Sequence, residues 1–422
     1  MGHGVFSYAG AFKYYLCVGI TKDDSHLKSD SHRINNMTSF QKAATSFLTV
    51  VAIGIFAAIL WVYQAKWQKP LGPALQIETV TPFKMPPTWT PEPGAAQPLL
   101  STPSLAPPTQ TSIPAATSTE AFGSCGLPSV MTLLAVGTDA RGDNYNYGLA
   151  DVIRLIRIDS IIPKVTVLEF PRDLWVEIPD IADNLDGQDH EKLNQAYLYG
   201  NPGFRYTDDP AQGPGLLART LALNFGTHIA HYGAVNMQTF VKIVDAVGGL
   251  DVTLPETVDG RTADDTNERL LFPKGQHHLN GTRALTLARI RIEGVFQRAD
   301  NQNIVLCALR KKLLSPAVIT DLPQLIQSFQ GAVQTDLSPQ QLSQLACIGP
   351  SLEPQNIIFT NFPEDIFTQD RVYDPVFNKS VFVWNADYDR VRDYVNQFNS
   401  GEWPQPVLVK QNTNEGASLN CQ

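Results

Sequence analysis

The sequence has little cysteine and little charge. Its five cysteines form no CxxC pair and no Cys/His spacing typical of zinc ligands, which excludes a zinc module or a redox motif of that kind. The 32 basic and 41 acidic side chains give a net charge of -9, which argues against a general electrostatic grip on nucleic acid. No GxSxG, Walker A or Rossmann glycine pattern is present. Any anionic ligand must therefore be held by a local cluster of arginines.

One long apolar run is present near the N-terminus. The uncharged stretch from Phe47 to Tyr63 is long enough to cross a bilayer, and aromatic residues gather at its far end. Basic residues precede it, so the positive-inside rule predicts a cytoplasmic segment over 1–46, a transmembrane signal anchor over 47–65 and an extracytoplasmic remainder. A cleaved signal peptide is the alternative, but the long segment before the run disfavours it. The basic residues are Lys13, Lys22, Lys28, Arg33 and Lys42.

Residues 66–128 are rich in Pro, Thr, Ser and Ala and cannot bury a core. This composition predicts a semi-extended spacer that holds the next domain off the bilayer or threads it into a wall layer. Export would place four cysteines in an oxidising compartment, where they allow three pairings. We favour Cys307 with Cys347 and Cys125 with Cys421, with free buried thiols equally open for the inner pair.

Short aliphatic runs alternate with helical patterns from residue 129 to residue 422, and we treat this stretch as one domain. The alternation predicts an α/β fold with helices on both faces of a sheet. We expect strands at 131–137, 151–158, 164–170, 231–237, 250–254 and 356–363, and helices at 213–226, 240–249, 282–290, 302–314, 321–333, 338–348 and 387–398.

Two carboxylates and an arginine lie near the ends of the first two expected strands. Asp139 and Arg141 follow the first strand, where open α/β sheets place their ligands, and Asp151 begins the second. Two carboxylates at one sheet edge suit Mg²⁺, which takes one or two carboxylates together with phosphate oxygens. A turn or cap role is the more common use of such an aspartate.

Arginines provide the strongest signal for an anion site. Arg172 and Asp173 close the third strand, either bracing a turn or offering bidentate donors to phosphate. Arg289 and Arg291 can serve one ligand only if the helix carrying Arg289 ends near it, because residues two apart diverge on a helix. The remaining pair, Arg298 and Gln302, share a helix face close to a helix N-terminus, which favours anions. Lys192 and Asn194 either touch this site or cap a helix.

The order of these motifs resembles the LytR-CpsA-Psr family of bacterial cell-envelope proteins. The resemblance extends over 130–315 and is carried by LLAVGTDAR, ADV, FPRDLWVEIP, KLNQAYLYG, HYGAVNM, FVKIVDAVGGLDV, LNGTRALTLARIR and the stretch from Arg298 to Gln302. It implies a mixed β-sheet sandwiched between helices, with an apolar pocket for a polyprenyl chain. It also implies transfer of an anionic glycopolymer from a polyprenyl-pyrophosphate carrier to a cell-wall acceptor, typically peptidoglycan, by Mg²⁺-assisted phosphoryl transfer.

The resemblance assigns roles to individual residues. It implies that Asp139 and Asp151 hold Mg²⁺ and that a cluster of donors holds the pyrophosphate. The base that takes the acceptor proton stays open between Asp173 and another carboxylate. The catalytic set is Asp139, Arg172, Arg289, Arg291 and Arg298, and the pyrophosphate set is Arg141, Arg172, Arg289, Arg291, Arg298 and Gln302.

The chain departs from the family pattern at three places. Asn301 stands where the family commonly has an arginine, and no arginine lies shortly before Asp151. The stretch between Arg291 and Arg298 is short and lacks the acidic Asp-x-x-Arg form of the family. Fewer phosphate donors keep two alternatives open, a non-catalytic polyprenyl-phosphate-binding regulatory protein and a polyprenyl-pyrophosphate phosphatase. The family implies a single-pass protein of the bacterial cytoplasmic membrane.

Overall fold

The computed structural model describes residues 38–77, 123–141, 145–185, 187–203, 206–207, 209–291, 295–319, 325, 329, 331–374, 378–404 and 418–421. The chain divides into two compact units, Met1–Trp67 and Gln68–Gln422, which are described separately below.

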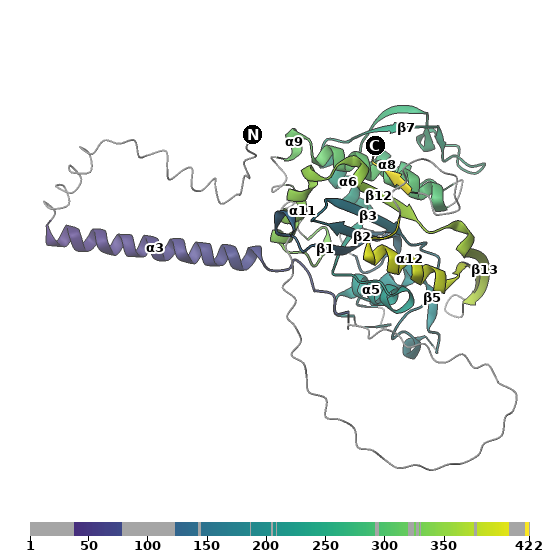
Figure 1. Cartoon of the computed structure of the whole chain (residues 1–422), viewed down its shortest axis with the longest axis horizontal. Helices are drawn as coiled ribbons and strands as arrows, with labels where there is room; N and C mark the ends of the chain where they lie inside the picture. The colour runs from purple at the N-terminus through teal and green to yellow at the C-terminus, as the bar shows by residue number, and fades with distance from the viewer. Residues whose placement is uncertain are drawn as a thin grey trace, which may run out of the picture. The chain divides into compact units, whose positions relative to one another are not determined.

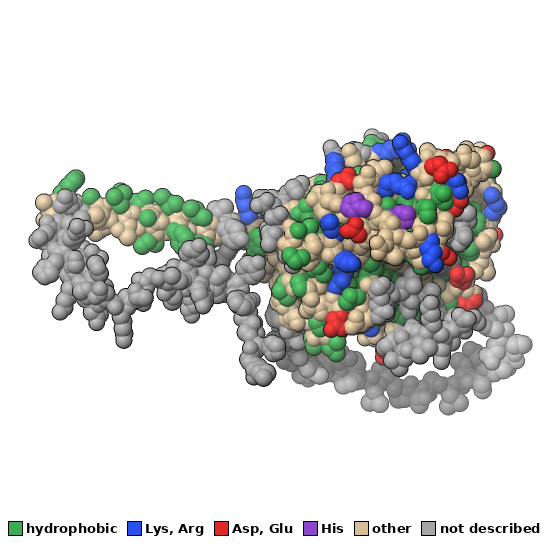
Figure 2. Space-filling view, turned by 90° about the horizontal axis from the view of Figure 1, so that it is seen from above, with side chains coloured by type: hydrophobic (Ala, Val, Ile, Leu, Met, Phe, Trp, Pro, Cys, Tyr) green, Lys and Arg blue, Asp and Glu red, His purple; other side chains and the backbone are tan. Residues whose placement is uncertain are grey.

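The first unit contains one long helix, α3 (Ser39–Trp67). Its apolar side chains are exposed, as Figure 2 shows along its length, and Ala43–Trp67 is long and apolar enough to cross a membrane. The predicted anchor over 47–65 lies inside this helix. The basic residues before Lys42 fall outside the described residues.

A mixed seven-stranded sheet forms the centre of the second unit, in the order β11-β6-β1-β2-β3-β12-β15. Antiparallel pairing joins β2 to β1 and β3, and parallel pairing joins β1 to β6 and β3 to β12. The carboxyl ends of β1, β3, β6 and β12 therefore meet at one edge. The strands are β1 (Val130–Thr138), β2 (Ala150–Asp159), β3 (Lys164–Glu169), β6 (His231–Asn236), β11 (Gln334–Thr335), β12 (Ile357–Asn361) and β15 (Ser418–Asn420).

Helices cover both faces of this sheet, as predicted (Figure 1). On one face α4 (Leu193–Gly200), α5 (Gln212–Phe225) and α12 (Tyr388–Ser400) bury their apolar side chains in the main core. On the other face, side chains of α8 (Val295–Leu313) and α11 (Pro339–Ile348) enter a smaller core. The helices thus leave the carboxyl edge of β3 and β12 beside the first turns of α8.

A third apolar core lies beside the sheet. It joins α6 (Met237–Ala246) and α7 (Gly281–Arg289) to the hairpin of β7 (Leu250–Leu254) and β10 (Gly275–Leu279). The remaining elements are β4 (Trp175–Glu177), β5 (His190–Lys192), β8 (Val258–Asp259), β9 (Leu271–Phe272), β13 (Phe367–Asp374), β14 (Lys379–Ala386), α9 (Pro316–Ile319) and the 3-10 turns η1 (Ser124–Gly126), η2 (Ala182–Asn184), η3 (Glu268–Leu270), η4 (Gly349–Ser351), η5 (Pro354–Asn356) and η6 (Glu364–Ile366).

Most expected elements are confirmed within a few residues. The predicted helix over 213–226 ends at Phe225, and Gly226 follows with φ 68°, a left-handed cap that favours glycine. The hairpin of β13 and β14 was not predicted. The residues of β13, FTQDRVYD, show no clear alternation of apolar and polar side chains, so nothing in the sequence pairs them with β14. The expected helix over 321–333 lies largely outside the described residues.

The first residues of the expected spacer are folded against the domain, contrary to the prediction. The Leu71 N–H donates to the Leu337 carbonyl at 3.2 Å, and the Tyr232 hydroxyl donates to the Pro73 carbonyl at 3.1 Å. Leu75 and Ile77 pack against the main core. Residues 71–77, which we call the strap, are therefore part of the folded domain, because composition alone does not reveal that two apolar side chains have a core to join.

The favoured disulfide pairing is wrong. The structure joins Cys125 to Cys347, with Cα atoms 5.9 Å apart, and Cys307 to Cys421, with Cα atoms 5.3 Å apart. The first bond forms because η1 packs against α11, and the second because β15 pairs with β12 and brings the C-terminal segment to α8. Both distances lie in the range that a disulfide requires.

Candidate functional site

A tight turn at the end of β3 presents Arg172 and Asp173. The Leu174 N–H donates to the Pro171 carbonyl at 3.3 Å, which closes a turn with Arg172 and Asp173 at its centre. The start of α4 fixes this turn, because the Asn194 N–H donates to the Arg172 carbonyl at 3.0 Å. Asn194 is thereby a buried support of the site.

Arg172 bridges two carboxylates, one at the start of β2 and one in its own turn. Its Nη1 donates to Oδ1 of Asp151 at the start of β2, and its Nε lies 3.2 Å from Oδ2 of Asp173. The other oxygen of Asp173 lies 3.3 Å from Nζ of Lys192, so Lys192 touches the site as well as preceding α4. Burial alone would lower the pKa of Arg172, but the charges of Asp151 and Asp173 raise it above its ordinary value.

Helix α7 ends at Arg289, near the end expected if Arg289 and Arg291 are to serve one ligand. Ile290 is extended (φ -64°, ψ 135°), so Arg291 leaves the helix and points its Nη2 to within 3.8 Å of Oδ1 of Asp151. Burial first, and then the charges of Arg298 and Arg172, lower the pKa of Arg291 to about 10. The positive charges here exceed what the nearby carboxylates offset, which favours a bound anion.

Arg298 and Gln302 face the sheet from α8, as predicted for residues four apart. Arg298 is 3% exposed, and its Nη2 lies 4.0 Å from Glu169, the last residue of β3. Among the described residues its Nε has no partner. Burial first lowers the pKa of Arg298, and the charge of Arg172 acts in the same direction. A buried guanidinium with a spare donor suits a phosphate oxygen.

Gln302 is fully engaged within the protein. Its side-chain oxygen accepts from Nη2 of Arg154 at 3.0 Å, and its Nε2 donates to the Ala288 carbonyl at 3.2 Å. Arg154 also donates to Asn303 at 2.8 Å and to Glu169 at 2.7 Å. This network fixes α8 on the sheet and positions Arg298.

Asp139 follows the last residue of β1 directly, at the start of the connection to β2. Its Oδ1 accepts from the Leu149 N–H at 2.7 Å, and its own N–H donates to the Leu149 carbonyl at 3.2 Å. A side chain on Gly148 would meet Oγ1 of Thr138 at 2.3 Å, so only glycine fits this close approach. The turn role considered for Asp139 is thus present, and its Oδ2 has no described partner.

The Asp139 and Asp151 carboxylates fit a hard divalent cation whose remaining ligands are water molecules and phosphate oxygens of the substrate. In the described part of the chain, no group of three His, Cys, Asp or Glu side chains could hold a metal. Asp139 and Asp151 are two carboxylates at one sheet edge, the number that Mg²⁺ combines with phosphate oxygens and water.

Two of the predicted residues stand apart from the cluster. Arg141 and Arg289 are exposed, and neither forms an ion pair with a described residue. Sequence reasoning missed Arg154 and Glu169, which carry charge on the inner face of an aliphatic strand pattern. A charged residue within each of these aliphatic runs was the one feature of the sequence that could have indicated a buried ion pair.

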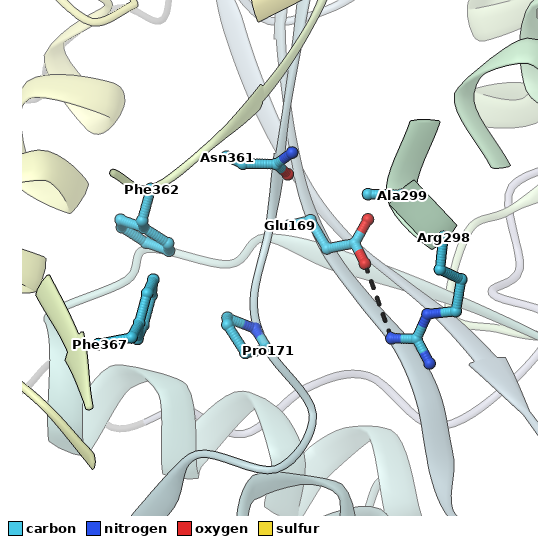
Figure 3. Close-up of a pocket in the computed structure, with 7 residues that line it drawn as sticks. All are labelled: Glu169, Pro171, Arg298, Ala299, Asn361, Phe362 and Phe367. Carbon is cyan, nitrogen blue, oxygen red and sulfur yellow. Dashed lines mark ion pairs between the residues drawn. The ribbon is translucent and has the colours of Figure 1, made fainter. Parts of the chain in front are cut away.

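A pocket opens beside this cluster. It is lined by Glu169, Pro171, Arg298, Ala299, Asn361, Phe362 and Phe367 (Figure 3). In Figure 3 the Glu169 and Arg298 side chains lie on one side and the two phenyl rings on the other.

The sequence matches the model of the LytR_cpsA_psr family over residues 117–397, which includes every site residue named above. The chain belongs to the LytR-CpsA-Psr family. The predicted resemblance is therefore confirmed, and the mixed sheet between helices agrees with it.

LytR-CpsA-Psr relatives carry two kinds of name. A protein of Oceanobacillus iheyensis named polyisoprenyl-teichoic acid–peptidoglycan teichoic acid transferase TagU is 31% identical over 218 residues, 51% of this chain and 61% of that protein. A Staphylococcus aureus protein named regulatory protein MsrR is 28% identical over 212 residues, 49% of this chain and 56% of that protein. The chain thus matches less than two thirds of the length of either relative.

A solved structure shares the fold. Protein gbs0355 from Streptococcus agalactiae superposes with a TM-score of 0.52 at 20% identity, covering 68% of this chain and 92% of that one. At this identity the likeness concerns the fold alone.

Proposed function

We propose that this protein transfers an anionic glycopolymer from a polyprenyl-pyrophosphate carrier to a cell-wall acceptor, in the manner that the name of the TagU relative describes. The observation that carries the proposal is the gathering of three guanidiniums, those of Arg172, Arg291 and Arg298, around Asp151 and Glu169. Nε of the buried Arg298 has no partner among the described residues, and burial first, then the charges of Arg298 and Arg172, lower the pKa of Arg291. A pyrophosphate would supply the missing negative charge.

The chemistry would be phosphoryl transfer. A hydroxyl of the acceptor attacks the glycan-bearing phosphorus and gives its proton to a carboxylate of the site, Asp173 or another. A new P–O bond forms, the P–O bond to the lipid phosphate breaks, and lipid monophosphate leaves. The arginines act by positioning and by neutralising charge that develops on the phosphoryl oxygens. Lys192 and Asp173 hold Arg172 in place for this task. Arg141 and Arg289, which stand apart from the cluster with exposed side chains, are proposed to reach the outer phosphate oxygens of a bound ligand.

A magnesium ion is part of the proposal. Asp139 and Asp151 would hold it, and it would supply charge neutralisation on the pyrophosphate. Arg172 and Arg291 now share Asp151, so they would turn toward the phosphate oxygens when the ligand enters. Gln302 keeps Arg154 in place and is proposed to act on the ligand through Arg298.

We also propose that the domain is extracytoplasmic and that α3 anchors it in the cytoplasmic membrane of a bacterium. Basic residues before α3 support an inside N-terminus by the positive-inside rule. The two disulfides support an oxidising compartment for the domain.

The test is a transfer assay on the detergent-solubilised full chain. The protein is mixed with a short-chain polyprenyl-pyrophosphate saccharide, with and without Mg²⁺ and peptidoglycan fragments, and the lipid is followed by mass spectrometry. We expect Mg²⁺-dependent transfer that Arg298→Ala abolishes. The matched control is Arg261→Ala, a half-buried arginine outside the site that also pairs with carboxylates.

Two observations favour a second candidate, a non-catalytic binder of polyprenyl phosphate. One relative is named a regulatory protein, and the Gln302 amide is occupied by Arg154 and Ala288. Recovery of intact lipid under every condition, with binding that depends on Arg298, would establish the binder. Release of lipid phosphate without acceptor would establish a phosphatase.

A further inference from the structure

The hairpin of β13 and β14 lies against the turn that carries Arg172 and Asp173. The Trp384 N–H of β14 donates to the Asp173 carbonyl at 2.9 Å, and Trp384 also forms an isolated parallel bridge with Leu174. The Phe367 ring of β13 packs edge to face against the Trp384 indole, with centroids 6.4 Å apart. A backbone bond from the hairpin therefore helps to fix the turn that presents the Arg172 guanidinium.

The other end of the hairpin is held by a pair of buried carboxyl groups. Of the eight residues of β13, Asp374 alone is buried, although it is charged. It faces Glu191, the middle residue of β5, and both side chains are 1% exposed. Strand β5 pairs with β4, which begins just after the Arg172 turn (Figure 1). The hairpin thus contacts the turn near one end and the β4–β5 ribbon at the other.

Glu191 accepts two hydrogen bonds from its own side of the pair. Nε2 of Gln188 donates to its Oε1 at 2.8 Å, and the Lys192 N–H donates to its Oε2 at 3.2 Å. The Lys192 ammonium is directed to Asp173 instead, 3.3 Å away. The other titratable groups near the pair are two phenols, an exposed lysine and a surface ion pair. They are Tyr199 of α4, Tyr206 beside it, Lys379 as the register partner of Asp374, and Asp189 with His190.

Two buried carboxyl groups in contact stay together only while they share a proton. Ionising both places like charges side by side in a poorly hydrated site, which costs free energy. Burial first, and then the charge of Asp374, raise the pKa of Glu191 to about 7. Below this pH the protonated carboxyl donates a hydrogen bond to the ionised one. The contact is therefore present in mildly acidic solution and weakened in alkaline solution.

We propose that Glu191, Asp374 and Trp384 are positioning residues for the phosphate site, and that losing the proton shared by the two carboxyl groups loosens the Arg172 turn. The proposal rests on the proposed function, since it takes Arg172 as a pyrophosphate-binding residue. The three residues act through the turn and not by touching the ligand. An apolar pair would hold the hairpin at every pH, so titration is what distinguishes this role from simple packing.

The test compares pyrophosphate binding by wild type and Glu191→Gln across the pH range. Farnesyl pyrophosphate is titrated into the detergent-solubilised full chain between about pH 5.5 and about pH 8.5, well below the melting temperature. The ligand itself titrates in this range, but equally for both proteins, so the ratio of their affinities isolates the protein. We expect the two affinities to agree within about 2-fold at the acidic end, and the wild type to bind about 5- to 10-fold more weakly at the alkaline end.

Two further variants and one measurement without ligand sharpen the test. Asp374→Asn should flatten the profile as Glu191→Gln does, because its amide can donate to an ionised Glu191. The matched control is Glu177→Gln, an exposed glutamate of β4 in the same ribbon, which should follow the wild type. Hydrogen exchange of peptides covering 171–178 and 379–386 reports the turn and β14 directly. Their protection in the wild type should fall relative to Glu191→Gln as the pH rises.

The proposal is overturned if wild type and Glu191→Gln share one affinity profile, or if Glu177→Gln flattens the profile equally. Equal pH dependence of exchange at 379–386 in wild type and Glu191→Gln would also overturn it. If the wild type binds no farnesyl pyrophosphate at any pH, the proposed function fails. The exchange measurement then decides by itself whether the carboxyl pair holds the hairpin on the turn.

Discussion

Arg154 and Glu169 face each other across β2 and β3, with Nη2 and Oε2 2.7 Å apart and both side chains almost completely buried. Arg298 approaches the other oxygen of Glu169 from α8. One carboxylate thus serves two buried guanidiniums, one that supports the fold and one that faces the candidate ligand.

Glu169→Gln should destabilise the protein strongly. It keeps the size of the side chain but leaves Arg154 and Arg298 without this carboxylate, which should cost on the order of 3 kcal/mol. Thermal and urea unfolding of the solubilised chain measure the loss, with the exposed Glu353→Gln as control. Adding Arg154→Met should recover part of it, since one unpaired charge is then gone. Equal stability of Glu169→Gln and wild type would contradict this account.

Replacing Arg172 by lysine should lower lipid turnover far more than replacing Arg289 by lysine. Arg172 donates to two carboxylates through different nitrogens, and lysine lacks that planar fork. Arg172→Lys should lower lipid turnover about 10-fold or more, whereas Arg289→Lys, at an exposed position, should change it less than about 2-fold. Rates of lipid phosphate release compare the two variants, and equal losses would show that the ion pairs of Arg172 do not matter.

The stability of the domain should fall as the pH rises through the weakly acidic range. Glu191 is 1% exposed beside Asp374, also 1% exposed. Burial first, and then the charge of Asp374, raise the pKa of Glu191 from 4.5 to about 7. The folded state therefore binds the proton more tightly than the unfolded state does.

The stabilisation is complete below pH 4.5, the ordinary value, and is lost as the pH rises toward 7. Glu191→Gln, which cannot ionise, should remove this dependence, which amounts to about 3 kcal/mol at about 1.4 kcal/mol per pKa unit. Melting temperatures of both proteins between pH 4 and 8 give the difference directly. Parallel curves for the two proteins would rule out a raised pKa at Glu191.

The disulfides should appear in non-reducing peptide maps as Cys125 with Cys347 and Cys307 with Cys421. Replacing the first pair by alanines should cost about 2–5 kcal/mol, because the bond closes a long loop in the unfolded chain. Unfolding with and without reductant gives the same quantity for the wild type. A peptide that links Cys307 to Cys347 would refute the pairing.

The sequence predicted what depends on local periodicity. The end of α7 near Arg289 follows from the helical pattern over 282–290, and the shared face of Arg298 and Gln302 follows from their spacing of four residues. Glu169 lies in KVTVLEF and could not be assigned a partner, because only the register of β2 with β3 brings Arg154 to it. The cysteine pairing depends likewise on β15, a strand of three residues.

The strap contacts would hold the anchor-bearing N-terminal part of the chain to the domain even if the peptide chain between them were cut. Residues 71–77 are bound to β6, the segment after β11 and the main core, and β1 begins only after residue 123. A protease site engineered between residues 78 and 122 would cut the covalent path from anchor to domain without removing those contacts. The cleaved domain should still co-purify with α3, and Tyr232→Phe, which removes the hydroxyl bond to Pro73, should let more of it dissociate. After such a cut, the fraction of domain that stays attached to α3 would be set by the binding equilibrium between the strap and the domain.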